Sequence, residues 1–247
     1  MIELRNLNKK FGDFYAVKDL NLQVRPREIF GFLGPNGAGK TTTIRMMVGL
    51  MKPTSGWILL GGRDVSLEPE EAKAILGYIP DRPFLYEKLT GEEFLEFIAG
   101  LHRLEAQDGW RKRSDELLEF FDLRRWRKEL IESYSHGMRQ RLIITAVLLL
   151  RPQILIVDEP VVGLDPKGTR LVKSLFLDLV TSGVTIFLST HILGIAEELC
   201  PRIGIIHEGK IIALGTMEEL RRQAQSTDER LEPLFLKLTE EENRLDP

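Results

Sequence analysis

Four short runs of aliphatic residues, each bounded by glycine, proline or charged residues, recur along the chain. They are residues 29–33 (IFGFL), 154–158 (ILIVD), 184–189 (VTIFLS) and 202–206 (RIGII). Nearly continuous apolar runs of this length are typical of strands buried on both faces, as in a parallel sheet covered by helices. Helices are predicted between them over residues 40–50, 165–180 and 192–199. The alternation predicts an α/β fold with a parallel sheet at its core.

The segments near the two ends of the chain show a different hydrophobic pattern from these apolar runs. Residues 20–24 (LNLQV) alternate apolar and polar side chains, as does the start of the chain. Such alternation favours an antiparallel β flank with one face exposed. Further on, Glu208 and Gly209 separate two apolar runs and predict a hairpin turn.

Residues 90–150 show almost no strand pattern. Thr90 and Glu93 form a Thr-x-x-Glu capping box, which predicts the start of a helix. Further helices are predicted over residues 109–121 and 137–150. We therefore expect an α-helical subdomain, about residues 88–150, inserted into an α/β domain of residues 1–220, with a polar, helical C-terminal tail over 221–247.

Composition narrows the class of protein. Of 247 residues, 43% are hydrophobic and 29% charged, which is typical of a globular protein and argues against wholesale disorder. With 34 Lys and Arg against 37 Asp and Glu, the formal charge is −3, so no basic field indicates a nucleic-acid partner. The single cysteine, Cys200, indicates a reducing compartment and a cytoplasmic location.

Apolar stretches along the chain are too short to cross a membrane. The longest, residues 142–150, is well under the roughly 18 residues that a spanning helix needs. The amino end (MIELRNLNKK) lacks the apolar core of a signal peptide. We therefore expect any membrane role to depend on a partner.

Residues 34–42 (GPNGAGKTT) match the phosphate-binding pattern G-x-x-x-x-G-K-[ST] between a predicted strand and a predicted helix. The predicted nucleotide-binding residues are Gly34, Pro35, Asn36, Gly37, Ala38, Gly39, Lys40, Thr41 and Thr42. The glycines let backbone N–H groups turn toward phosphate oxygens, and Lys40 adds a positive charge at the helix N-terminus. The Thr41 hydroxyl is expected to bind Mg²⁺, which makes ATP and Mg²⁺ the predicted cofactors. An ordinary glycine-rich turn is the alternative, and the flanking strand and helix disfavour it.

The run 154–158 ends in two consecutive carboxylates, Asp158 and Glu159. Buried carboxylates are costly unless they meet a cation or a proton. Asp158 is expected to hold the Mg²⁺ ion, through water, and Glu159 to polarise an attacking water molecule. Alone, the pair fits a solvated strand end equally well, and the phosphate-binding pattern favours catalysis. His191 follows the end of another strand, where such sheets bind ligands, and is the predicted γ-phosphate contact, although a lone histidine is more often structural.

Residues 134–141 (YSHGMRQR) resemble the LSGGQ signature of the ATP-binding subunits of ABC transporters, and its common variant S-x-G-M-R-Q-R. The Asp-Glu strand end, residues 163–166 (GLDP, the D-loop) and His191 follow in the order of that family, over about residues 1–220. The resemblance implies a head-to-tail dimer, of identical or different chains, with two ATP molecules between the subunits.

The same resemblance assigns three further nucleotide-binding residues. Ser135 and Gly137 of one subunit would face the γ-phosphate held by Lys40 of the other, and Asp165 belongs to the D-loop. A small hydroxyl residue and a glycine at a helix N-terminus can form an anion site. A plain helix cap is the alternative for this segment.

Three positions depart from the family. His136 stands where the short signature has glycine, and its side chain is expected to be solvated. Where the family usually has glutamine, this chain has Asp81, a predicted Mg²⁺ ligand; alternatively it caps the loop beside Arg82 and faces solvent. The adenine-stacking aromatic residue is Phe11 in place of the commoner tyrosine. Phe14 or Tyr15 could serve instead, or Phe11 could be a core side chain.

By resemblance, the chain is an ATPase subunit that drives export through separate transmembrane permease subunits at the cytoplasmic face of the membrane, as in the prokaryotic export type. In that family, residues 81–90 (DRPFLYEKLT) and the helices after them contact the membrane subunit. The apolar trio 84–86 either forms a surface knob or packs inward. The alternatives are a soluble ABC-type ATPase acting on ribosomes or DNA, and a regulatory ATP-binding module without turnover, which Glu159 and His191 disfavour.

Overall fold

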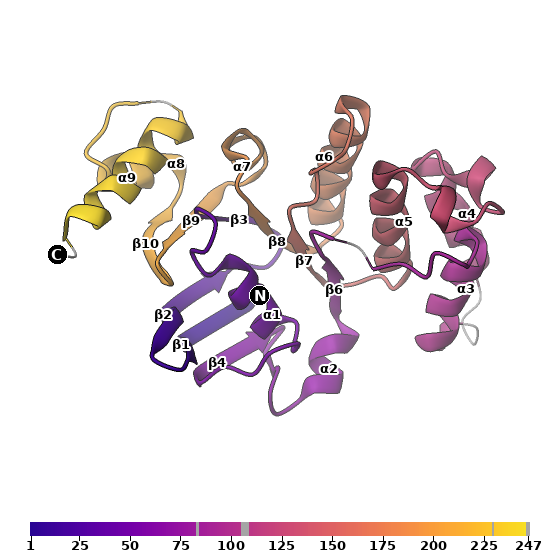
Figure 1. Cartoon of the computed structure of the whole chain (residues 1–247), viewed down its shortest axis with the longest axis horizontal. Coiled ribbons are helices and arrows are strands. Elements are labelled where there is room, and N and C mark those ends of the chain that lie inside the picture. Colours follow the sequence, from indigo (N-terminus) through magenta and orange to yellow (C-terminus); the bar gives the residue numbers. More distant parts are fainter. Residues whose placement is uncertain (83, 105–108, 229, 246–247) are drawn as a thin grey trace.

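The computed structural model describes residues 1–82, 84–104, 109–228 and 230–245, without the side chains of 241–245. Residue 83 of the predicted partner-contacting loop, and residues 229, 246 and 247 of the predicted tail, lie outside the described residues. Figure 1 shows a central sheet, a smaller sheet below it, a group of helices on one side and two C-terminal helices on the other.

The central sheet has six strands in the order β10-β9-β3-β8-β7-β6. They are β3 (Ile29–Leu33), β6 (Leu76–Ile79), β7 (Ile154–Asp158), β8 (Thr185–Thr190), β9 (Arg202–His207) and β10 (Lys210–Gly215). Neighbours from β9 to β6 pair in parallel, and β10 pairs antiparallel with β9. Every residue of β3, β7 and β8 is buried, which explains their mostly apolar sequences and confirms the predicted parallel core.

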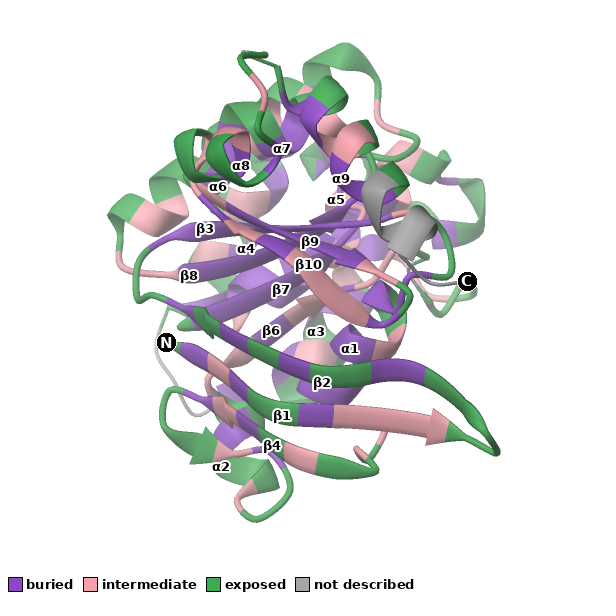
Figure 2. Ribbon diagram, turned by 90° about the vertical axis from the view of Figure 1, so that its left-hand side faces the viewer, coloured by how far each residue is buried: buried purple, intermediate pink, exposed green. Residues whose placement is uncertain are grey.

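Both faces of this sheet are covered, as Figure 2 shows. Helices α6 (Pro166–Thr181) and α7 (Leu193–Leu199) lie on one face. The other face carries α1 (Lys40–Met47) and a four-stranded sheet in the order β2-β1-β4-β5. Those strands are β1 (Ile2–Phe11), β2 (Phe14–Val24), β4 (Ser55–Leu60) and β5 (Arg63–Asp64). Their pairing is antiparallel, which confirms the predicted flank.

Between β6 and β7, the described residues form three α-helices. They are α3 (Gly91–Leu101), α4 (Trp110–Phe120) and α5 (His136–Leu149); the short 3₁₀ turns η2 (Arg124–Trp126) and η3 (Ile131–Ser133) lie between α4 and α5. The Thr90 hydroxyl accepts a hydrogen bond from Glu93 N at 3.2 Å, and the Glu93 carboxylate accepts one from Thr90 N at 2.8 Å. The predicted capping box therefore starts α3. A further short helix, α2 (Pro69–Ala74), precedes β6.

The chain ends in α8 (Met217–Gln223) and α9 (Leu231–Leu245). Helix α8 spans the predicted boundary between the domain, which ends at residue 220, and the tail, which begins at residue 221. Leu231, Leu234 and Leu238 are buried in the hydrophobic cluster that also contains Leu199 of α7. The hairpin between β9 and β10 turns at Glu208 (φ 45°) and Gly209 (φ 80°), as predicted. Across the described ranges, no helix combines the length and the apolar character needed to cross a membrane.

Candidate functional site

The carboxyl ends of β3, β6, β7 and β8 meet at one edge of the central sheet, where ligands bind in open α/β folds. A cavity of about 330 Å³ opens at this edge. It is lined by Asn36, Lys40, Thr41, Asp81, Arg82, His136, Asp158, Glu159, Val162 and His191. The structure thus brings together predicted residues from four separate segments of the sequence.

The loop from Gly34 to Gly39 is shaped by close contacts that only glycine allows. A Cβ atom on Gly34 would lie 2.3 Å from Ile206 O, and one on Gly39 would lie 2.5 Å from Ala16 O. Gly39 also has φ +107°, in the left-handed region. The β9–β10 hairpin supports the loop, because Gly209 N donates to Ala38 O at 2.9 Å. The loop is therefore held in one conformation from which its backbone amides can face an anion.

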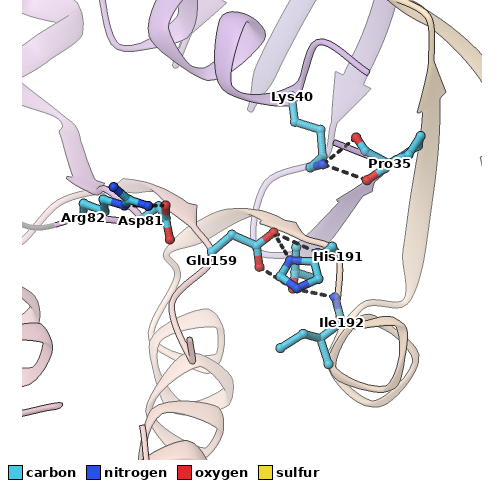
Figure 3. Close-up of polar contacts among 9 residues, drawn as sticks. Pro35, Lys40, Asp81, Arg82, Glu159, His191 and Ile192 are labelled. Carbon is cyan, nitrogen blue, oxygen red and sulfur yellow. Dashed lines mark hydrogen bonds and ion pairs between the residues drawn. The ribbon is translucent and has the colours of Figure 1, made fainter. Parts of the chain in front are cut away.

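Lys40 lies under this loop with 8% of the residue exposed. Its Nζ atom donates to Gly34 O at 2.7 Å and to Pro35 O at 3.0 Å (Figure 3). Burial lowers the pKa of Lys40, while the charges of Glu159 and Asp158 oppose that effect. Within the described part of the chain, no carboxylate lies within ion-pair distance of this ammonium group. A buried cation beside backbone donors fits an anionic ligand such as a phosphate group.

Asp158 ends β7 and is 4% exposed. Burial raises the pKa of the Asp158 carboxyl, and the charges of Glu159 and Asp81 raise it further, although other contacts act in the opposite direction. With Thr41 in the same cavity, this donor set consists of oxygen atoms, which suit Mg²⁺. In the ranges that the structure describes, no three His, Cys, Asp or Glu side chains form a metal site by themselves.

Glu159, the residue after β7, is fixed by the neighbouring strand. Its Oε1 atom accepts a hydrogen bond from His191 N at 2.9 Å and lies 2.7 Å from His191 Nδ1. Its Oε2 atom accepts one from Thr190 Oγ1 at 3.0 Å (Figure 3). The backbone of Glu159 has φ 50°, an uncommon value for a residue with a side chain. Thr190 is a functional candidate that the sequence analysis missed; its position directly before His191 is the signal that could have identified it.

Asp81 lies after β6 at the edge of the same cavity. Its Oδ2 atom is 3.9 Å from Arg82 Nε, and 44% of its side chain is exposed. Asp81 therefore shares the cavity with Asp158 and Thr41 and also lies beside Arg82, as the solvent-facing alternative in the sequence analysis described, while its role as a Mg²⁺ ligand stays a prediction.

Ser135, Gly137 and Asp165 are not among the residues that line the Lys40 cavity. The Ser135 hydroxyl accepts a hydrogen bond from Met138 N at 3.3 Å and caps α5. Asp165 accepts one from Gly168 N at 2.8 Å and caps α6. These three residues therefore lie at two helix N-termini outside the lining of the cavity, although His136, between Ser135 and Gly137, is part of that lining.

His136, the residue between Ser135 and Gly137, links the signature segment to the D-loop. Its ring packs on Gly163, where an added Cβ atom would lie 2.3 Å from the ring carbon Cδ2. Gly163 also has φ +78°, which a glycine adopts without strain. The start of α5 and the D-loop are therefore in contact within one chain.

A second cavity, of about 530 Å³, lies on the other side of the phosphate-binding loop. It is lined by Phe14, Tyr15, Lys18, Pro35, Asn36, Gly37, Ala38, His207, Glu208 and Lys210. Phe11 is outside this lining; it is 48% exposed at the end of β1, with Lys9 Nζ 5.1 Å from its ring centre. The sequence analysis missed Lys18, His207 and Lys210, which are scattered polar residues in strands and carry no motif.

Comparisons with known proteins identify the family. A family model described as ABC transporter matches residues 17–162. The chain is 38% identical over 241 residues to the probable multidrug ABC transporter ATP-binding protein YbhF of Escherichia coli K12, covering 96% of this chain and 41% of that protein. The chain thus spans less than half the length of YbhF. It is 36% identical to the ABC-type transporter ATP-binding protein EcsA of Bacillus subtilis, and the match covers 98% of each chain.

Two solved structures resemble the fold. The ATP-binding subunit of an ABC transporter superimposes with a TM-score of 0.91 and 35% identity, covering 97% of this chain and 99% of that chain. The ATP-binding cassette MJ0796, solved as a dimer in a post-hydrolysis state bound to ADP and Pi, gives a TM-score of 0.79 and 28% identity, covering 87% of this chain and 98% of that chain. The motifs, the fold and these matches agree: the chain belongs to the ABC transporter family of ATP-binding proteins.

Proposed function

We propose that this chain binds and hydrolyses ATP as a subunit of an ABC transporter, dimerises around two ATP molecules and drives export through separate transmembrane subunits. The observation that carries the proposal is the cavity in which Lys40, Asp158, Glu159 and His191 meet. The names of YbhF and EcsA, both transporter ATP-binding proteins, support the same assignment. The export direction rests on YbhF, whose name describes a probable multidrug transporter.

Some residues of the cavity bind ATP, and others catalyse its hydrolysis. The backbone amides of residues 34–42 and the Lys40 ammonium group bind the phosphates of ATP. The Glu159 carboxylate orients the attacking water and accepts its proton, and His191 stabilises the γ-phosphate. A general base of this kind contributes about 10²–10⁴-fold in rate, which corresponds to roughly 3–5.5 kcal/mol of barrier.

Thr41, Asp158 and Asp81 are the proposed ligands of the Mg²⁺ ion, Asp158 through water. When bound, the ion neutralises charge that develops on the phosphate oxygens. The contacts of Glu159 with Thr190 and His191 keep its carboxylate aimed across the end of β8 (Figure 3). We propose Phe11 as the ring that stacks on adenine, with Phe14 and Tyr15 at the second cavity as the alternatives.

The proposed dimer uses residues that the Lys40 cavity leaves out. Ser135 and Gly137 do not line the cavity of their own Lys40, and we propose that they complete the site of a second subunit, with Asp165 at the junction. MJ0796, which shares this fold, has been solved as a dimer. Identical chains and two different chains would both satisfy this arrangement.

An exposed aromatic surface is the proposed contact with the transmembrane subunits. Phe84 is 81% exposed and Tyr86 50% exposed, whereas Leu85 between them is buried. The rings of Phe84 and Tyr86 are 5.9 Å apart, and those of Tyr86 and Phe97 are 5.3 Å apart. Exposed apolar patches of this kind mark interaction sites. Docked in this way, the chain would be a cytoplasmic subunit, peripheral at the inner face of the membrane.

Two measurements test the proposal. Purified protein should release phosphate from ATP in the presence of Mg²⁺, which a regulatory module without turnover would not do. A pull-down from the native host should recover a polytopic membrane protein. Recovery of ribosomes or DNA in its place would favour a soluble ABC-type ATPase and contradict the transport role.

A further inference from the structure

Residues 86–90, in the loop that begins at Asp81, lie against the backbone that precedes α5. The contacts are Ile131 N to Leu89 O at 2.9 Å, Glu132 N to Glu87 O at 3.1 Å, and an isolated bridge between Thr90 and Leu130. Residues 87–90 are therefore joined to the segment that leads into α5, the helix capped by Ser135.

Arg139, in the second turn of α5, fastens the two segments together. Its Nη1 atom donates to the Glu87 carboxylate at 2.5 Å. Its Nη2 atom donates to Glu132 O at 3.1 Å, and its Nε atom donates to Tyr134 O at 3.2 Å. A planar guanidinium group that donates in three directions fixes the relative position of the groups it contacts. We call these three contacts the Arg139 clamp.

The charge of Arg139 does not stabilise α5 itself. A positive charge near a helix N-terminus opposes the helix dipole, and the first turn of α5 contains no acidic residue. The compensating charge comes instead from Glu87, which is far away in the sequence. The Arg139 clamp therefore fixes the loop relative to the start of α5 and contributes less to the stability of α5 itself.

We propose that Arg139 is a positioning residue, which sets Ser135 and Gly137 for the nucleotide of the partner subunit and makes their position depend on residues 84–90. The inference rests on the proposed function, because Ser135 matters only where two subunits enclose ATP. The Tyr134 carbonyl that Arg139 holds belongs to the residue directly before Ser135. A shift of residues 84–90, by a protein docked on Phe84 and Tyr86, is thereby transmitted through Glu87 to the signature segment.

The test uses the full chain carrying Glu159→Gln, which is expected to keep ATP bound. Glu87→Ala removes only the carboxylate of the clamp, and Arg139→Lys keeps the charge but loses the three-way geometry. Glu87→Asp keeps a carboxylate and serves as the rescue. Lys88→Ala is the matched control, because Lys88 forms an exposed ion pair with Glu132 at the same contact. The readouts are the dimer dissociation constant in Mg-ATP by sedimentation, and the ATP dissociation constant of dilute monomer with a fluorescent nucleotide.

Glu87→Ala and Arg139→Lys are expected to weaken the dimer by about 5- to 30-fold, the effect of losing one charge-assisted contact. ATP binding by the monomer should be unchanged, Lys88→Ala should match its parent, and Glu87→Asp should recover most of the loss. Unchanged dimer strength in both clamp variants would overturn the proposal. So would an equal loss of monomer ATP binding, since the pair would then only support the fold. A Glu159→Gln parent that stays monomeric in Mg-ATP would instead contradict the proposed function, and the inference would fall with it.

Discussion

Glu159 is partly buried, with 12% of its side chain exposed, and its carboxylate contacts Thr190 and His191. Glu159→Gln keeps the shape of the side chain and the acceptor for Thr190, but it removes the negative charge that orients water. We expect turnover to fall by about 10²–10⁴-fold, while ATP binding persists because Lys40 and the phosphate-binding loop are untouched. Steady-state phosphate release and nucleotide binding measure the two effects separately. Normal turnover in this variant would show that another group is the base.

Asp81 adds a second carboxylate close enough for its charge to raise the pKa of Asp158. Near phosphates this extra charge is tolerable only while a cation is present, so we expect ATP binding by this chain to depend steeply on Mg²⁺. Asp81→Asn removes the charge at nearly constant size. The variant should bind ATP better without metal and gain less from added Mg²⁺. ATP titrations of both proteins, with Mg²⁺ and with EDTA, measure this; the same ratio of affinities in both would place Asp81 outside the metal site.

At the level of single residues, candidate site residues that belong to a sequence motif could be predicted, whereas those that depend on their place in the fold could not. The phosphate-binding pattern and the Asp-Glu pair specify chemistry by residue type and spacing, and five of their residues line one cavity: Asn36, Lys40, Thr41, Asp158 and Glu159. Thr190 belongs to no such pattern; only its place directly before His191 marks it in the sequence, and its contact with Glu159 depends on strand register. Asp158 pairs with Ser189 across β7 and β8, which places the next residue of each strand side by side. No pattern within one strand reports that pairing.

At the level of elements, the capping box of α3 carries a measurable share of stability. Thr90→Ala removes the hydroxyl that accepts from Glu93 N, and loss of such a cap costs about 1 kcal/mol. We expect a lower free energy of unfolding and faster amide exchange in the first turn of α3. Thr216→Ala is a matched control, since Thr216 and Glu219 form the same box at α8; it should speed exchange in α8 only. Equal exchange in α3 for Thr90→Ala and the parent would contradict the role of the cap.

The elements that the sequence predicted well are those with a strong local cause. Strands β3, β7 and β8 are buried and mostly apolar, and α3 starts at a capping box. The two-residue strand β5 and the turns η2 and η3 are short and depend on contacts with distant segments, so no local pattern predicts them. The trio 84–86 shows the same limit, because Leu85 is buried by tertiary packing while its two neighbours are exposed.

For the whole molecule, the buried thiol of Cys200 links stability to pH. Burial raises the pKa of Cys200 to about 12 in the folded protein. Because the unfolded chain loses this proton at a lower pH, the thiol contributes stability that is complete below about pH 9 and declines as the pH approaches 12. The decline has a limiting slope of about 1.4 kcal/mol per pH unit. Urea unfolding of the parent and of Cys200→Ala between pH 8 and 11 should show a difference in stability that shrinks with pH. Parallel curves would contradict the link.

One chain alone does not complete the proposed ATP site, because Ser135 does not line the cavity that contains Lys40 of the same subunit. The γ-phosphate is the group that both would contact, so nucleotide should decide the oligomeric state. We expect a largely monomeric protein without nucleotide, and a shift toward dimer in sedimentation with Mg-ATP and Glu159→Gln.

ADP is the discriminating ligand for that model, because it occupies the phosphate-binding loop but lacks the phosphate that bridges the subunits. It should therefore promote the dimer far less than ATP at matched saturation. Lys40→Ala in the same background, which removes the cation that holds the phosphate, should abolish the response to ATP. A dimer of equal strength with ADP and ATP would mean that the subunits associate through some other surface, and the arrangement of two ATP molecules between subunits would not apply to this chain.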